Sequence, residues 1–307
     1  MSSHRIPLVA TTVAALVALA APAMAGGAFD PVGGEVSAGK VAGLKYVTES
    51  LAVGSSGTMD PPYEEAAVSC GPHSSPWHPT AGGAKMSGGA AANTIKALRP
   101  LDLDDAFETP PNSTPDDWWD VTVKSVVGRT LTGYAVCSTS TFSYVRLSVP
   151  ADTSTDRTAT VSCPAGKHLV GGGGFIATSD SRITSSFPVD GDTWKVALFD
   201  SVGGLGGMEA YAVCRKAGRV ARVSHRVGGI GADTADTATV MCAPTRHVIG
   251  GGGRMGGPIA QGSLAASLPV DGSDGDQIPD DGWRVVGYNH GGAAKALTAY
   301  ALCVKKG

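Results

Sequence analysis

The chain has 307 residues and a formal net charge of −3 at pH 7, without any block of basic residues. This charge argues against nucleic acids and anionic membrane surfaces as partners. With 43 glycines, 42% apolar residues and few aromatic residues, the composition indicates many short strands joined by turns, rather than disorder or long helices.

Residues 1–25 have the features of a secretory signal peptide. A short basic start precedes an apolar run, and Ala23-Met24-Ala25 matches the small-residue pattern of a cleavage site. A membrane anchor is the alternative, but the run is rich in Ala and lacks the roughly 20 strongly apolar residues that a spanning helix needs. We therefore predict cleavage after Ala25 and export of a mature chain that does not insert into a membrane. Residues 26–42, full of small residues, are predicted to form a flexible leader.

The rest of the chain is predicted to consist of three copies of one unit, at 43–138, 141–216 and 219–305. Each copy has an early cysteine in a similar segment ("EAAVSC", "TATVSC", "TATVMC") and a closing segment with Tyr three residues before Cys ("TGYAVC", "EAYAVC", "TAYALC"). A Trp stands 18 to 20 residues before every closing Cys, at Trp119, Trp194 and Trp283. Such self-similarity is the signature of repeat architectures.

The segments within a copy are short, rich in Val, Tyr, Phe and Thr, and separated by Gly, Asp and Pro. In "TWKVALF" (193–199), Trp194, Val196 and Leu198 alternate with residues of the opposite face, which is the period of a β-strand. We predict an all-β protein with five or six antiparallel strands per copy. Because the linkers are short, the copies are expected to pack about a pseudo-threefold axis, as in a β-prism; three small β-sandwiches in series are the alternative.

Six cysteines fall two to a copy in a chain predicted to be exported, which favours disulfide bonds. Six cysteines can pair in 15 ways, and copies that fold alike favour the pairings within each copy. The predicted bonds are Cys70–Cys137, Cys163–Cys214 and Cys242–Cys303. The alternative, a metal site, is not supported, because no Cys-x-x-Cys and no pair of His residues accompanies these cysteines at ligand spacing.

Four consecutive glycines occur at 171–174 and again at 250–253. A phosphate-binding loop would need a following Lys-Ser/Thr pair and a dinucleotide-binding loop would need a βαβ unit, and neither is present. Glycine within a strand indicates a bulge, a bend or the close approach of another backbone. We therefore predict that these glycines let strands pack where the copies meet.

The chain contains neither a Gly-x-Ser-x-Gly elbow nor a His-Glu-x-x-His motif, so an enzyme is the less favoured interpretation. His168 and His247 occupy matching positions five residues after a Cys, where packing or hydrogen bonding is favoured over a general base. We predict no metal site and no cofactor. The acidic segment 271–281 lacks the ligand spacing of an EF-hand, so a solvated loop is the main interpretation and an irregular calcium site is the alternative.

Candidate binding residues come from segments that differ between the copies. The first copy alone carries the Pro-stiffened loop "GPHSSPWHP" at 71–79, in which Trp77 could stack on a sugar or contact a partner. Anchoring of this loop against the core is the alternative. The candidate binding residues are Trp77, His78, Trp118, Asp274 and Asp276.

The layout "ATVSCPAGKHLVGGGG", "SSFPVDG", Trp and "AYAVC" resembles a repeat found in secreted bacterial proteins that have no assigned activity. The resemblance covers most of the second and third copies and, loosely, the first, and it implies no functional residue. In architecture the three antiparallel units also resemble β-prism folds, such as jacalin-type lectins and vitelline membrane outer layer protein. The specific motifs of those families are not matched, so no function is carried over from them.

These observations predict a secreted, non-catalytic binding or structural protein. Its variable loops are expected to contact a glycan, the cell wall or another extracellular protein, because repeated scaffolds commonly place their contacts on divergent loops. The alternatives are a secreted hydrolase without a recognisable motif, and an envelope or spore-coat component.

Overall fold

The computed structural model describes residues 43–52, 63–72, 75–102, 117–125, 128–176, 178, 180–201, 206–216, 218–274 and 276–306. The predicted signal peptide and leader lie outside these residues. The described parts form eighteen β-strands and two short 3-10 turns, η1 (Ala90–Ala92) and η2 (Ile259–Gln261), and they contain no α-helix. The predicted all-β class is confirmed.

The strands fall into three groups of six, which we call units 1, 2 and 3. Unit 1 contains β1 (Leu44–Ala52), β2 (Tyr63–Ser69), β3 (His78–Met86), β4 (Thr94–Leu101), β5 (Trp118–Lys124) and β6 (Thr130–Ser138). Unit 2 contains β7 (Ser143–Val149), β8 (Asp156–Ser162), β9 (His168–Ile176), β10 (Ser181–Pro188), β11 (Thr193–Asp200) and β12 (Met208–Arg215). Unit 3 contains β13 (Ala221–Ile230), β14 (Thr234–Met241), β15 (Arg246–Met255), β16 (Gly262–Val270), β17 (Gly282–Asn289) and β18 (Lys295–Lys305).

All three units have the same internal strand pairing. The sixth strand lies between the first and the third, and the fifth lies between the second and the fourth, always antiparallel. The alternation predicted from sequence is clear in β8, where Arg157, Ala159 and Val161 are buried and their neighbours are exposed. Each unit is therefore made of two three-stranded half-sheets.

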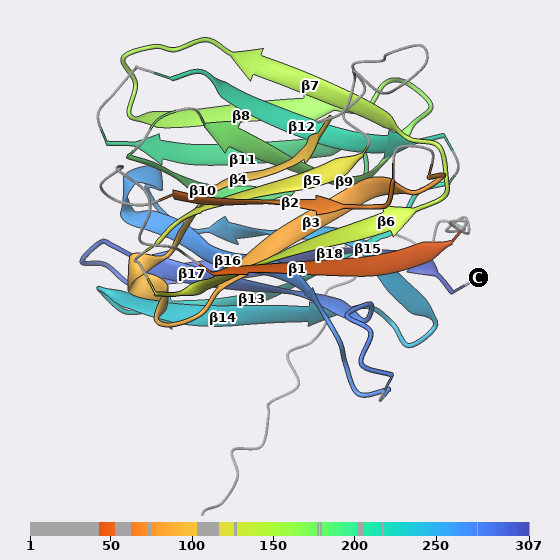
Figure 1. The fold of residues 1–307 in the computed structure, drawn as a ribbon. Coiled ribbons are helices and arrows are strands. Elements are labelled where there is room, and N and C mark those ends of the chain that lie inside the picture. The colour runs from red at the N-terminus through yellow and green to blue at the C-terminus, as the bar shows by residue number, and fades with distance from the viewer. Residues whose placement is uncertain are drawn as a thin grey trace, which may run out of the picture.

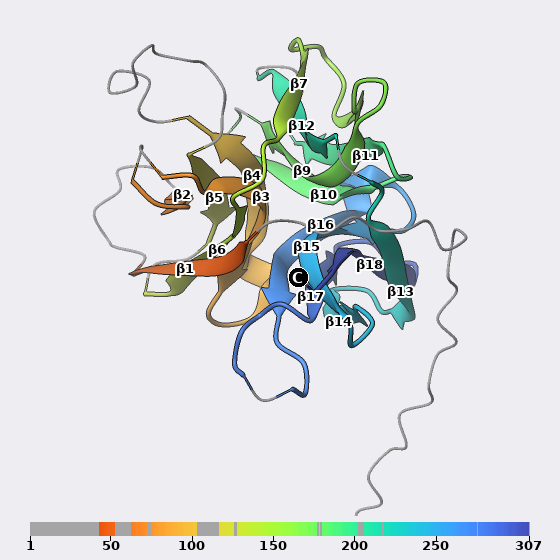
Figure 2. The same cartoon turned by 90° about the vertical axis from the view of Figure 1, so that its right-hand side faces the viewer.

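Every half-sheet continues into a half-sheet of another unit. Pairing of β3 with β16 joins units 1 and 3, pairing of β4 with β9 joins units 1 and 2, and pairing of β10 with β15 joins units 2 and 3. The result is three six-stranded antiparallel sheets, each shared by two units. Figure 1 shows the strands from the side, and Figure 2 shows the three units grouped around the centre of the molecule.

Glycines make the three junctions between units possible. One glycine in each third strand lies against a backbone carbonyl of the fourth strand that it meets: Gly83, Gly173 and Gly252. At Gly173, a Cβ atom would lie 1.8 Å from the carbonyl oxygen of Leu98, well inside van der Waals contact. The prediction that the glycines let strands pack where the units meet is confirmed.

The recurring tryptophans fill the core. Trp119, Trp194 and Trp283 are at most 1% exposed, and each packs against a glycine of its own unit. Trp194, for example, lies so close to Gly172 that a Cβ there would be 2.6 Å from the indole ring. The large ring thus occupies the space that the glycine leaves free.

The three disulfides are those predicted: Cys70–Cys137, Cys163–Cys214 and Cys242–Cys303. In every unit the first cysteine directly follows the second strand and the other lies in the sixth strand. Because these strands belong to different sheets, each disulfide ties two of the three sheets together.

Candidate binding pocket

A pocket of about 540 Å³ lies where unit 1 meets unit 3. The start of β1 forms one wall, and the loop between β16 and β17 forms the other, together with parts of β15 and β18. The lining residues are Gly43, Leu44, Lys45, Tyr46, His247, Asp276, Ile278, Asp280 and Lys305. Because the two walls are far apart in the chain, the pocket depends on the joining of the two units.

Tyr46 holds the β1 wall against unit 3. Its hydroxyl donates a 2.6 Å hydrogen bond to the carbonyl of Val248. Burial raises the pKa of the Tyr46 hydroxyl, and the carboxylates of the 271–281 loop, Asp280 foremost, raise it further. Tyr46 therefore stays neutral, and its proton stays in the bond to unit 3.

The opposite wall carries a group of carboxylates. One oxygen from each of Asp274, Asp276 and Asp280 lies within 4.8 Å of the others. The amide of Ile278 donates a 2.8 Å hydrogen bond to Asp276, which helps to shape the loop. The ammonium of Lys306 is 3.7 Å from Asp274, so some of this negative charge is balanced at the exposed side.

Asp280 is the buried member of the group. Its side chain is 5% exposed, and its Oδ2 is paired with Nδ1 of His247. Burial raises the pKa of Asp280, and the neighbouring His247 opposes that rise. The Oδ1 atom of Asp280 has no hydrogen-bond partner within the described part of the chain.

A similar pair occurs in unit 2, where Nδ1 of His168 lies 2.7 Å from Asp192, although Asp192 corresponds in backbone position to Asp281 and not to Asp280. In the strand pairing, each histidine lies opposite the residue that follows the closing Cys of its unit: His168 opposite Arg215, and His247 opposite Val304. The hydrogen bond between His168 and Asp192 supports the function predicted for His168, whereas His247 is paired with a carboxylate from a neighbouring position of its loop. His78 of unit 1 has the same register, opposite Ser138.

The structure brings together only part of the predicted binding set. Asp276 lines the pocket and Asp274 lies beside it in the carboxylate group. Trp77 is near: the ammonium of Lys45, a pocket residue, lies 4.7 Å from the centre of its ring. Trp77 is also partly buried against the core, as the loop-anchoring alternative expected.

The other two candidates lie elsewhere. His78 begins β3, and Trp118 begins β5 as a partly buried residue; neither lines the pocket. Conversely, Tyr46, Lys45 and Lys305 were not singled out from the sequence. No local motif distinguishes them, since they become functional candidates only when β1 lies beside unit 3.

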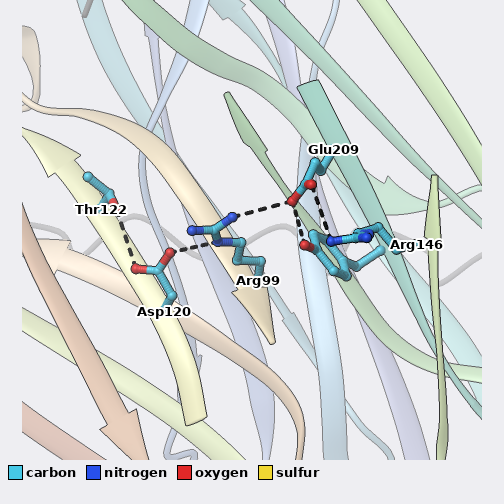
Figure 3. Close-up of polar contacts among 6 residues, drawn as sticks. Arg99, Asp120, Thr122, Arg146 and Glu209 are labelled. Carbon is cyan, nitrogen blue, oxygen red and sulfur yellow. Dashed lines mark hydrogen bonds and ion pairs between the residues drawn. The ribbon is translucent and has the colours of Figure 1, made fainter. Parts of the chain in front are cut away.

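A charged cluster joins units 1 and 2 on the face of their shared sheet (Figure 3). Arg99 of β4 donates a 2.9 Å hydrogen bond from Nε to Asp120 of β5 and lies 3.3 Å from Glu209 of β12. Its guanidinium also stacks on Phe175 of β9, 3.8 Å from the ring centre. Arg99 thus links strands on both sides of the junction between β4 and β9, which indicates a structural function.

Asp120 in this cluster is expected to make stability depend on pH. Burial raises its pKa to about 6, although Arg99 opposes the shift. Because the pKa of Asp120 is higher in the folded state than in the unfolded state, the folded protein holds this proton more tightly. The resulting stability is fully present at a pH below the unfolded pKa, and it is lost as pH rises through about 6. We expect the free energy of unfolding to fall by about 2 kcal/mol between pH 4 and pH 7 on account of Asp120.

Urea unfolding across this pH range would measure the effect. Asp120→Asn should remove this part of the pH dependence, whereas Asp236→Asn, which removes an exposed carboxylate, should keep it. An Asp120→Asn variant with the wild-type slope would contradict the prediction.

The fold and the pocket define an all-β protein of three disulfide-bonded, six-stranded units, with a pocket of mixed polar and apolar lining between the first and the third. Comparison of the chain with models of known protein families finds no match, and comparison with curated protein sequences finds none either. No helix in the described parts is long and apolar enough to cross a membrane. The pocket is therefore the feature from which a function can be inferred.

Proposed function

We propose that this protein is exported and acts outside the cytoplasm as a non-catalytic binding protein. The signal-like residues 1–25 support export. The three disulfides support it too, because such bonds persist in oxidising compartments.

We also propose that the three units form a β-prism-like arrangement about a pseudo-threefold axis. The cyclic order of the junctions supports this arrangement. The third strand of unit 1 pairs with the fourth strand of unit 3, the third strand of unit 3 pairs with the fourth of unit 2, and the third strand of unit 2 pairs with the fourth of unit 1. A tyrosine contact recurs in the same order, since Tyr46 of unit 1 bonds Val248 of unit 3 and Tyr144 of unit 2 bonds Pro79 of unit 1.

The proposed ligand is a cell-wall or other extracellular glycan, bound in the pocket between units 1 and 3. The observation that carries this proposal is the mixed lining, in which Lys45 and Lys305 can donate hydrogen bonds and Asp276 can accept them. Sugar hydroxyls do both, so they fit a lining of this kind. The apolar side chains of Leu44 and Ile278 add surface for the carbon face of a sugar ring.

A glycan array and a cell-wall pull-down with the mature chain test this function. Lys305→Gln should weaken glycan binding at least about tenfold, because a hydrogen bond from a charged group is lost from the pocket. The matched control is Lys216→Gln: Lys216 follows Cys214 by two residues, as Lys305 follows Cys303, and it is exposed in unit 2.

Equal binding by both variants would place the ligand outside the pocket. No binding by the wild-type chain to any array glycan or to cell wall would reject the proposal. That result, with no turnover, is the one expected of an envelope or spore-coat component.

A secreted hydrolase is the second candidate, because the pocket contains the pair of His247 and Asp280. A carboxylate that holds a histidine ring is a common arrangement for a general base. Release of soluble reducing sugars from cell wall by the wild-type chain, abolished in His247→Gln, would favour the hydrolase. We expect no release, because a similar pair of His168 and Asp192 occurs in unit 2, outside this pocket, and this favours a structural function.

A further inference from the structure

The buried carboxylate of Asp280 has one oxygen without a partner. His247 pairs with Oδ2, whereas Oδ1 has no hydrogen-bond partner among the described residues, and only 5% of the side chain is exposed. Buried polar atoms in native proteins are almost always paired with a donor, an ordered water or an ion. The Oδ1 atom of Asp280 therefore points to a ligand.

The carboxylates around Asp280 supply further acceptors. Oxygens of Asp274 and Asp276 lie within 4.8 Å of the Asp280 carboxylate. The Tyr46 hydroxyl, which could otherwise donate, gives its proton to the carbonyl of Val248. Three carboxylates so close together repel one another, and Lys306 balances their charge only at the exposed side, beside Asp274.

We propose that a calcium ion binds between Asp274, Asp276 and Asp280. Calcium takes six to eight oxygen ligands in flexible geometry, and carboxylates of a short loop supply such ligands together with backbone carbonyls and waters. Magnesium fits less well, because it demands near-ideal octahedral geometry and gives up its waters reluctantly.

The ion has a structural consequence for the pocket. It connects the buried end of the 271–281 loop, at Asp280, to the exposed part at Asp274 and Asp276. It thereby fixes the wall that faces β1. The effect of the ion on the binding pocket rests on the proposed function. The calcium site itself is inferred from the three carboxylates alone.

Isothermal titration of calcium chloride into the chelator-treated mature chain tests the site. We expect one ion per chain with a dissociation constant of about 10⁻⁴ to 10⁻³ M, typical of extracellular modules, and a thermal midpoint that rises with calcium. Asp274→Asn combined with Asp276→Asn should weaken calcium binding at least about tenfold, because two of three charged ligands are lost. Both side chains are exposed, so the variant should still fold.

The matched control is Asp190→Asn, which lies at the position of Asp271 in the corresponding loop of unit 2 and should bind calcium like the wild type. The site is overturned if about 10 mM calcium gives neither heat nor a midpoint shift, or if the double variant binds like the wild type. An equal shift with magnesium would also overturn the calcium assignment. No glycan is present in these measurements, so failure of the calcium site and failure of glycan binding are separate results.

Discussion

Gly173→Ala is expected to prevent folding, or to lower the free energy of unfolding by at least about 3 kcal/mol. The added Cβ would lie 1.8 Å from the carbonyl oxygen of Leu98, a backbone atom of the neighbouring unit. Relief would require β9 and β4 to separate, and these strands form the junction between units 1 and 2. Urea unfolding, followed by tryptophan fluorescence, measures the loss.

The matched control for this substitution is Gly228→Ala in β13. Gly228 has no atom within 4 Å of the position of an added Cβ, so the change should cost less than about 1 kcal/mol. Equal stability of the Gly173→Ala and Gly228→Ala proteins would show that the junction does not depend on the absence of a Cβ atom at residue 173.

Replacement of Cys163 and Cys214 together by alanine should lower the free energy of unfolding by roughly 4 kcal/mol. The bond closes a loop with a sequence separation of 51 residues, and its loss gives the unfolded chain more freedom. Since the other two separations are 67 and 61, the three double variants should differ from one another by less than about 1 kcal/mol. Urea unfolding of each variant, with the oxidised wild-type chain as reference, measures these costs.

Two results would contradict the disulfide prediction. One is a wild-type chain whose unfolding midpoint does not change when it is fully reduced. The other is a non-reducing peptide map that contains a bond between units, because every bond in the structure lies within one unit.

Much of the structure within each unit could be predicted from the sequence, because each position of the unit occurs three times in the chain and the three occurrences can be compared. Cys pairing followed from the equivalence of the copies, and the strand at 193–199 followed from the alternation of Trp194, Val196 and Leu198 with residues of the opposite face. The glycine run at 171–174 was predicted to let strands pack closely, because the residues around it do not fit a phosphate-binding loop.

The sharing of sheets between units could not be predicted in the same way. The junction of β3 with β16 rests on the pairing of Ser267 with Ala84, two residues that no sequence pattern connects. The pocket has the same origin. Asp274 and Asp276 stand out as acidic residues in a loop, but the meeting of that loop with Tyr46 depends on long-range packing.

The shared sheets limit how this chain can be divided. A fragment with only one unit would expose two half-sheets, each with an unpaired inner edge, and such edges invite association. A polypeptide of one unit could complete its sheets only by pairing with other chains. Excised units should accordingly self-associate or aggregate, rather than behave as independent modules.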